Sequence, residues 1–290
     1  MPPAVVAGSE REPHLERATK FKAADAVALA AGAAVTVIFF LSNGSRTEGK
    51  HLLLAAGITL AFALLGWLSR GVNASGAVAG AAVAFVLAAR DLRMFWVLLL
   101  VFVITFLATR IGGPRKRQLS VSEAPEGRSA SQVMANLGVA AFLTALIPVG
   151  WQLMALAALA EAAADTSSSE VGTAFPGRTV LLTSWKPVTP GADGGVSLSG
   201  TAAALIAAGA VGITANLFRL AGGHHALVII YAGVLGMLVD SLLGALLERR
   251  GFLNNDAVNL LSTASAAVLA RPFFGQSTPV ALVMALVASQ

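Results

Sequence analysis

Long runs of apolar residues, separated by short polar stretches, dominate this sequence. A helix needs roughly 20 predominantly apolar residues to span a bilayer, because lipid cannot satisfy backbone amides and only a helix or a closed barrel satisfies them internally. The runs are continuous and rich in Ala, Leu and Gly, without the alternation typical of a β-barrel. With 56% hydrophobic and 12% charged residues, the chain is suited to lipid rather than water. We therefore predict an all-α, polytopic membrane helix bundle.

The apolar runs predict about 8 to 10 transmembrane helices. We expect a cytoplasmic N-terminal tail at residues 1–24 and a transmembrane domain at residues 25–290. The domain would carry motif-bearing loops at residues 110–132, 165–197 and 248–256. The predicted spans lie at residues 26–41, 52–69, 72–89, 92–109, 133–149, 153–164, 198–218, 226–247, 257–270 and 279–289.

Charge distribution predicts the orientation of this bundle. Most of the 20 Lys and Arg residues fall on one side when the N-terminus is placed inside the cell. The positive-inside rule then places the N-terminus and the three motif loops in the cytoplasm, in a protein of the cytoplasmic membrane. We interpret the net charge of +5 as topology and lipid-headgroup contact, and expect no nucleic-acid partner. The absence of Cys excludes disulfides and thiolate metal sites.

A first polar cluster follows the fourth predicted span and contains A-T-R-I-G-G-P-R-K-R and then G-R-S-A-S-Q-V-M-A-N. If the second part is helical, Arg128, Gln132 and Asn136 fall at i, i+4 and i+8 on one face. A cation and two amides on one stripe can hold a phosphate and fix its orientation. A positive-inside anchor with helix–helix hydrogen bonds would give the same pattern.

Carboxylates mark a second cluster, E-A-A-A-D-T-S-S-S-E. Glu161 and Asp165 share a face at the end of an apolar helix, where a carboxylate is costly unless it is paired or bound to a cation. Asp165 and Glu170, with the hydroxyls between them, offer the hard oxygen ligands that Mg²⁺ takes. A helix N-cap formed by Asp or Ser is the alternative explanation.

A glycine-rich stretch, T-S-W-K-P-V-T-P-G-A-D-G-G-V-S, follows this cluster. Its prolines forbid a regular helix, and Gly191, Gly194 and Gly195 permit positive φ. Amides exposed in such a turn can bind phosphate oxygens, with Lys186 supplying charge. The spacing is not that of a P-loop, and an ordinary loop would explain it equally well.

The third cluster spans two predicted helices, V-D-S-L-L-G-A-L-L-E-R-R and F-L-N-N-D-A-V-N-L-L-S-T. Asp240 lies on a glycine-containing face that lets another helix approach closely. Asn255 and Asn259 form an i, i+4 pair, with Asp256 adjacent. A single Asn in a membrane helix usually serves packing, but so many polar groups in a short stretch exceed that need.

Together these motifs resemble the membrane-protein family that includes plant phytyl-phosphate kinase. The resemblance covers roughly residues 60–269, and the matching blocks stand in the same order as in the family. They are N-A-S-G-A-V-A-G, G-R-S-A-S-Q-V-M-A-N, A-D-T-S-S-S-E-V-G, K-P-V-T-P-G-A-D-G-G-V-S, D-S-L-L-G-A and L-N-N-D-A-V-N. Two positions depart from the family pattern: Arg110 stands where Lys is usual, and Ser167 where Trp is common.

The resemblance implies CTP-dependent phosphorylation of an isoprenoid monophosphate, phytyl or prenyl, to its diphosphate. The expected cofactors are Mg²⁺ and CTP as the phosphoryl donor, and the expected partners are membrane lipid, the isoprenoid phosphate and the nucleoside triphosphate. A cytosolic nucleotide would meet a lipid phosphate at the membrane surface while the apolar tail stays between helices. Positioning and charge neutralisation supply most of the catalysis in such a transfer.

These considerations give a set of candidate site residues. We expect catalytic roles for Asp165, Asp193 and Asp240, and metal ligation by Asp165, Glu170, Asp193 and Asp256. Nucleotide and phosphate binding is expected from Lys116, Arg128, Gln132, Asn136, Lys186, Gly191, Gly194, Gly195, Asn255 and Asn259.

Two other functions share part of this pattern. A transporter of a small solute or lipid phosphate would also use intramembrane carboxylates and broken helices, but would gather them near the midplane. A CTP-dependent lipid cytidylyltransferase would share both substrates and release pyrophosphate. The oligomeric state is not encoded in any of these motifs.

Overall fold

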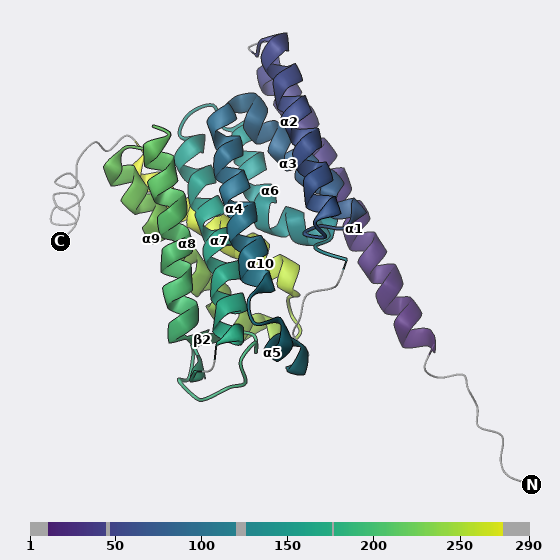
Figure 1. Ribbon diagram of the computed structural model, residues 1–290, viewed down its shortest axis with the longest axis vertical. Coiled ribbons are helices and arrows are strands. Elements are labelled where there is room, and N and C mark those ends of the chain that lie inside the picture. Colours follow the sequence, from purple (N-terminus) through teal and green to yellow (C-terminus); the bar gives the residue numbers. More distant parts are fainter. Residues whose placement is uncertain (1–10, 45–46, 120–125, 176, 275–290) are drawn as a thin grey trace, which may run out of the picture.

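The computed structural model of the protein describes residues 11–44, 47–119, 126–175 and 177–274, with side chains from residue 23 onward. Its described part is a bundle of helices with one small β-hairpin at one end (Figure 1). The predicted tail leads into the first helix, which begins at Arg11. The predicted span at residues 279–289 lies outside the described residues.

The described residues form ten α-helices, a π-helical turn and a short 3₁₀ turn. Strands β1 (Thr179–Leu181) and β2 (Gly195–Ser197) pair antiparallel. The helices are α1 (Arg11–Asn43), α2 (Gly49–Leu68), α3 (Ala74–Arg90), α4 (Leu92–Arg110), α5 (Gly113–Gln118), α6 (Ala130–Leu146), α7 (Trp151–Ala174), α8 (Leu198–Leu217), α9 (Gly223–Leu243) and α10 (Asn255–Ala270), with the π-turn η2 (Gly244–Glu248) and the 3₁₀ turn η3 (Arg271–Phe273).

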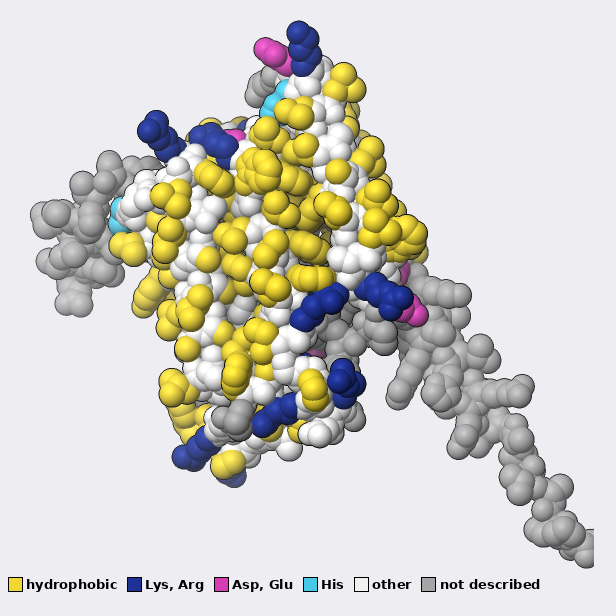
Figure 2. All heavy atoms as spheres, viewed as in Figure 1, with side chains coloured by type: hydrophobic (Ala, Val, Ile, Leu, Met, Phe, Trp, Pro, Cys, Tyr) yellow, Lys and Arg dark blue, Asp and Glu magenta, His cyan; other side chains and the backbone are white. Residues whose placement is uncertain are grey.

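The length and composition of the helices confirm a membrane protein. Among the described residues, five helical segments are long and apolar enough to cross a bilayer: Ala23–Asn43, Gly49–Leu68, Leu92–Arg110, Leu198–Leu217 and Gly223–Glu248. Helices α3 and α6 are apolar but shorter. Figure 2 shows a wide hydrophobic band over the helices, with most Lys and Arg side chains above or below it. Large apolar side chains exposed on such a band are expected when the surrounding solvent is lipid.

Helix α7 is the centre of the bundle and packs against α4, α6, α8, α9 and α10. Residues 155–160 are completely buried, and four of these six are Ala. Small side chains allow neighbouring helices to approach closely in a membrane, where van der Waals contact and hydrogen bonds drive association. The burial continues into the polar C-terminal half of α7, where Thr166, Ser167, Gly172 and Thr173 are also buried.

The chain brings its motifs to one end of the bundle. We call this end the hairpin face, because it carries α5 and the β1–β2 hairpin (Figure 1). The N-terminal ends of α3, α6, α8 and α10 lie there with the C-terminal ends of α2, α4, α7 and α9, as the alternation of crossing helices requires. All three predicted motif loops belong to this face.

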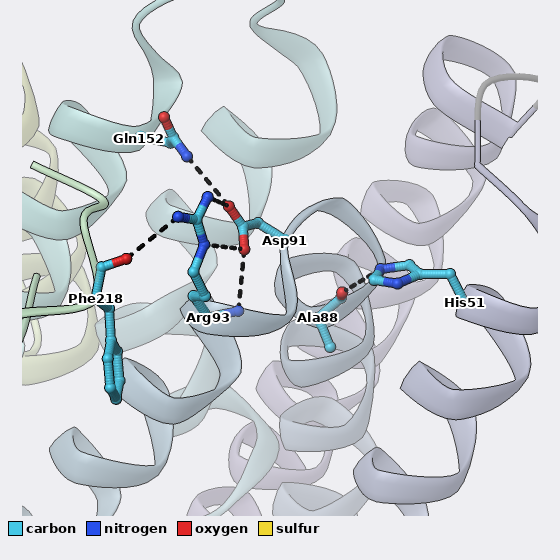
Figure 3. A network of polar contacts seen from close by, with 6 residues as sticks. All are labelled: His51, Ala88, Asp91, Arg93, Gln152 and Phe218. Carbon is cyan, nitrogen blue, oxygen red and sulfur yellow. Dashed lines mark hydrogen bonds and ion pairs between the residues drawn. The ribbon is translucent and has the colours of Figure 1, made fainter.

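The opposite face is tied together by a network around Arg93 (Figure 3). Arg93 donates to both carboxylate oxygens of Asp91, with Nε–Oδ1 at 3.0 Å and Nη2–Oδ2 at 2.7 Å, and its Nη1 donates to the Phe218 carbonyl at 3.2 Å. Gln152 approaches Asp91 at 3.4 Å, and the His51 ring nitrogen contacts the Ala88 carbonyl at 3.0 Å. These contacts link α2, α3, α4, α7 and α8 far from the motifs.

Two predicted boundaries were wrong. The loop expected at residues 165–197 begins too early, because α7 continues to Ala174 and so makes almost three more turns. The Ser and Thr hydroxyls of this segment suggested a loop. In the structure they donate hydrogen bonds to carbonyls of the preceding helical turn, as Thr173 Oγ1 does to the Ser169 carbonyl at 2.7 Å. Arg128 is also not on the helical stripe expected for it, since α6 begins at Ala130.

Candidate functional site

An apolar cavity of about 480 Å³ lies between α2, α3, α4 and α6. Its walls are mostly aliphatic, aromatic or glycine, with Phe62, Gly80, Leu98, Phe102 and Leu137 among them. Leu98 is 1% exposed, so this end of the cavity is deep within the bundle. A space of this kind suits an apolar tail entering from the membrane.

Basic side chains surround the other end of the apolar cavity, at the hairpin face. Arg70, Arg110, Lys116, Arg117 and Arg128 all contribute to its lining there. Arg110 stacks over the Phe106 ring at 4.1 Å and donates to the Ser69 carbonyl at 2.8 Å. This end of the cavity is therefore suited to an anionic group attached to an apolar tail.

A second, polar cavity of about 310 Å³ lies beside the first. It is formed by the C-terminal half of α7, the loop before β2, the end of α9 with η2, and the starts of α6 and α10. Carboxylates, hydroxyls and amides predominate in its walls. They include Asp165, Thr166, Ser168, Ser169, Glu170, Thr173, Asp193, Ser197, Asp240, Ser241, Glu248, Asn255 and Asn259.

Three side chains line both cavities: Arg128, Gln132 and Asn136. The sequence predicted that these three would act together, and the structure places them at the junction, although Arg128 precedes the helix. Gln132 Oε1 accepts from the Ser129 amide at 2.9 Å, so its amide group retains donors for a ligand oxygen. Asn136 is 8% exposed and donates to the Gln132 carbonyl at 2.9 Å.

The backbone of Arg128 is fixed by the turn before α3. Its amide donates to the Gly71 carbonyl at 3.1 Å, and its carbonyl accepts from the Asn73 amide at 3.0 Å. Gly76 makes this approach possible, because a Cβ there would lie 2.1 Å from the Arg128 carbonyl oxygen. The N-A-S-G motif therefore positions Arg128 at the junction of the two cavities.

Carboxylates cluster on the α7–α9 side of the polar cavity. Asp165 on α7 and Asp240 on α9 act electrostatically on each other, and both act on Glu161, which is 1% exposed. Glu248 lies near Asp165 and Asp193. Arg128 is the cation that attracts Asp165. So many carboxylates at the end of a membrane bundle are costly unless cations neutralise them.

The donor set fits a hard divalent cation that is held jointly with a ligand. Among the described residues, no three His, Cys, Asp or Glu side chains form a preformed metal cluster. Mg²⁺ is typically bound by one or two carboxylates, with water and substrate phosphates completing its shell. Asp165 and Asp240 provide such a pair, and Asp240 Oδ2 is buried with no hydrogen-bond partner among the described residues.

Lys116 and Glu170 form an ion pair between the cavities. Lys116 is 2% exposed and lines the apolar cavity, whereas Glu170 lines the polar one. The Lys116 ammonium donates to Glu170 and to the carbonyls of Ala108 at 3.1 Å and Thr109 at 2.9 Å. These three acceptors use all three ammonium protons, so in this conformation Lys116 fixes α5 against α4 and α7.

The glycine-rich loop packs against the π-turn. Gly191 and Gly194 have φ of +85° and +71°, as the sequence predicted, whereas Gly195 has no positive φ because it begins strand β2. A Cβ on Gly194 would lie 2.5 Å from Ala245, so this glycine is also required for close packing. The amide of Gly195 donates to the Ala192 carbonyl at 2.9 Å, and phosphate binding by that amide would compete with this bond. The phosphate-binding role of the loop stays a prediction.

Two expected residues lie outside the cavities, and others were missed. Lys186 is exposed on the hairpin and lines neither cavity, and Asp256 acts on Glu248 without contributing to the lining. Glu248 was missed, because the span carrying Asp240 was expected to end at residue 247, whereas the π-turn η2 continues to Glu248 and brings it to the polar cavity. Asp25 was also missed; it accepts from Ser75 Oγ at 2.8 Å and the Ser131 amide at 3.1 Å, and so ties α1 to the starts of α3 and α6.

Comparison with known proteins gives relatives from several organisms. The chain is 33% identical over 178 residues to the uncharacterized membrane protein MJ0933 of Methanocaldococcus jannaschii, covering 59% of this chain and 72% of the relative. It is 32% identical over 233 residues to Protein PGR of Arabidopsis thaliana, covering 70% and 81%. Protein VTE6, chloroplastic, of the same plant is 28% identical over 182 residues, covering 58% and 55%.

No solved structure matches the chain at a significant level. The sequence relatives nevertheless confirm the resemblance to the family that includes plant phytyl-phosphate kinase. The family match itself covers most of the chain and includes every motif block described above. Residues 57–267 match the family described as integral membrane protein DUF92, and the chain belongs to this family.

Proposed function

We propose that the protein is a membrane kinase that converts an isoprenoid monophosphate to its diphosphate, with CTP as the phosphoryl donor. The observation that carries the proposal is the pair of cavities, one apolar with a basic end and one polar and acidic, which share Arg128, Gln132 and Asn136. A lipid phosphate and a nucleotide polyphosphate would meet at these side chains. The choice of CTP and of an isoprenoid rests on the family resemblance.

In the proposed reaction, the isoprenoid tail occupies the apolar cavity and its phosphate contacts Arg128. An oxygen of that phosphate forms a bond to the γ-phosphorus of the nucleotide. The bond from this phosphorus to the β–γ bridging oxygen breaks, and that oxygen keeps the electron pair and leaves as part of the nucleoside diphosphate. A phosphate monoester has its second pKa near 6, so the attacking oxygen is already anionic at neutral pH and needs no general base.

The residues of the chain would act by positioning and by charge. Arg128 offers a planar fork of donors to oxygens from both substrates, and the amides of Gln132 and Asn136 orient them. Asp165 and Asp240 would hold Mg²⁺, which, when bound, neutralises charge on the transferred phosphoryl group. Asp193 and Glu248, which line the same cavity, would add oxygen ligands.

The position of a radioactive label in CTP tests the reaction type. Purified protein in detergent is incubated with farnesyl monophosphate, Mg²⁺ and CTP labelled at either the α- or the γ-phosphorus. We expect the γ label, and not the α label, in farnesyl diphosphate. Transfer of the α label would instead show a cytidylyltransferase. Transport of farnesyl monophosphate across liposomes without labelled product would show a transporter and contradict the proposal.

A variant at the junction tests the proposed site. Arg128→Gln should lower kcat/KM for labelled CTP by about a hundredfold or more, because a desolvated charge-assisted contact to both phosphates is lost. The fold should persist, since the backbone groups of Arg128 make the contacts with Gly71 and Asn73. Arg271→Gln, at the exposed opposite face, is the matched control. Equal turnover in both variants would remove Arg128 from the site.

A further inference from the structure

Gly80 has no packing reason to be glycine. Glycine in the middle of a helix lowers helix stability relative to Ala, so it is usually retained where another group comes close. Gly76, one turn earlier in α3, follows this rule through its contact with the Arg128 carbonyl. A Cβ on Gly80, by contrast, would meet no atom within 4 Å. The space beside Gly80 is the apolar cavity, which this residue lines.

The cavity is deep enough for a defined length of tail. Its lining on α4 runs from Arg110 to Leu98, a separation of twelve positions, or roughly 18 Å of helix. An extended chain advances roughly 1.2 Å per bond, so this depth accommodates roughly 15 main-chain bonds, or three to four isoprene units. Gly80 lies six residues into α3, roughly 9 Å from its start at the hairpin face and thus about half way along the cavity.

We infer that Gly80 is a specificity-determining residue, which keeps the inner half of the apolar cavity open and so sets the longest isoprenoid tail that the site accepts. This inference rests on the proposed function, because it takes the occupant to be the tail of the lipid phosphate. The basic side chains at the cavity mouth support that occupant, since they match a phosphate joined to an apolar chain. A larger side chain at position 80 divides the cavity and leaves room for roughly two isoprene units.

The test compares how ligands of two tail lengths bind to the purified wild type, Gly80→Leu and Gly57→Leu. Gly57 is the matched control, because a Cβ there also meets nothing within 4 Å, yet it is exposed on α2 and lines neither cavity. Geranyl and geranylgeranyl monophosphates, of ten and twenty carbons, are each added, and the rise in melting temperature is measured without nucleotide. In Gly80→Leu the rise with the geranylgeranyl compound should disappear, while the rise with the geranyl compound is retained. Gly57→Leu should behave as wild type.

Turnover with CTP gives the second readout. The ratio of kcat/KM for the twenty-carbon to the ten-carbon substrate should fall by about tenfold or more in Gly80→Leu, because an added side chain in occupied space forces strain. Gly80→Ala adds one methyl group and should give a smaller fall, which guards against a misfolded Leu variant. An unchanged length preference in both binding and turnover would overturn the inference, as would the absence of any ligand-induced stabilisation of wild type. Length-dependent binding by a wild type without kinase activity would instead overturn the proposed function alone.

Discussion

At the scale of single residues, the site is a balance of charges near the end of a membrane bundle. Asp165, Asp240 and Glu248 are brought together by α7, α9 and the π-turn, and Arg128 is the cation that acts on Asp165. Desolvated carboxylates of this kind destabilise a protein that has no cation to bind. Their arrangement therefore favours a binding role over a role in stability.

This balance gives a prediction for Asp165→Asn. The variant should lower the rate of phosphoryl transfer by about a thousandfold, because the loss of one metal contact raises the barrier by several kcal/mol. Its melting temperature without substrate should be equal to or above that of wild type, since a buried charge is removed. Glu48→Gln, at the exposed start of α2, is the control for both measurements. A large loss of stability in Asp165→Asn with normal turnover would make Asp165 a structural residue.

At the scale of secondary-structure elements, hydrophobic runs predicted the apolar helices well. They did not show that the polar segment at the end of α7 is helical. The nine predicted spans that fall on described residues each correspond to a helix. The C-terminal half of α7 was missed as a helix because its Ser and Thr hydroxyls resemble a loop in composition, whereas they satisfy the backbone of the preceding turn. Whether this segment forms a helix or a loop depends on the neighbouring helices that bury α7, and no local sequence pattern reveals it.

The sequence likewise predicted only part of the candidate site. Helical spacing correctly grouped Gln132 with Asn136, and the acidic character of the second and third clusters indicated Asp165 and Asp240. Spacing could not show that Lys186 faces away, because the hairpin orientation is fixed by the pairing of Thr179 with Ser197. It also gave no sign that the Lys116 ammonium is already saturated by contacts from α4 and α7. Tertiary packing alone determines the direction of Lys186 and the contacts of Lys116.

Helix α3 supplies the prediction at this scale. Gly76→Ala should destabilise the protein by about 1–3 kcal/mol, because the new methyl group would overlap the Arg128 carbonyl oxygen at 2.1 Å and force the two segments apart. Gly80→Ala in the same helix meets no atom and should retain or raise stability. Reversible unfolding in mixed detergent micelles measures both. Equal stability of the two variants would show that the close approach at Gly76 contributes nothing.

At the scale of the whole molecule, function depends on which face meets the cytosol. The two cavities, the hairpin and the basic mouth all belong to one face, whereas the Arg93 network closes the other. A nucleoside triphosphate is available only on the cytosolic side of a cell membrane. The proposed kinase therefore requires the hairpin face to be cytosolic, as the distribution of Lys and Arg also predicts.

Cysteine labelling tests this orientation cleanly, because the chain has no Cys of its own. Lys186→Cys and Arg117→Cys place thiols on the hairpin face, and Lys50→Cys and Arg219→Cys place them at exposed positions on the opposite face. A membrane-impermeant maleimide added to intact cells should label only the second pair, and all four should react after the membrane is permeabilised. The reverse pattern in intact cells would place the polar cavity outside the cytosol. It would then separate the site from its nucleotide and exclude the kinase, whatever the geometry at Arg128.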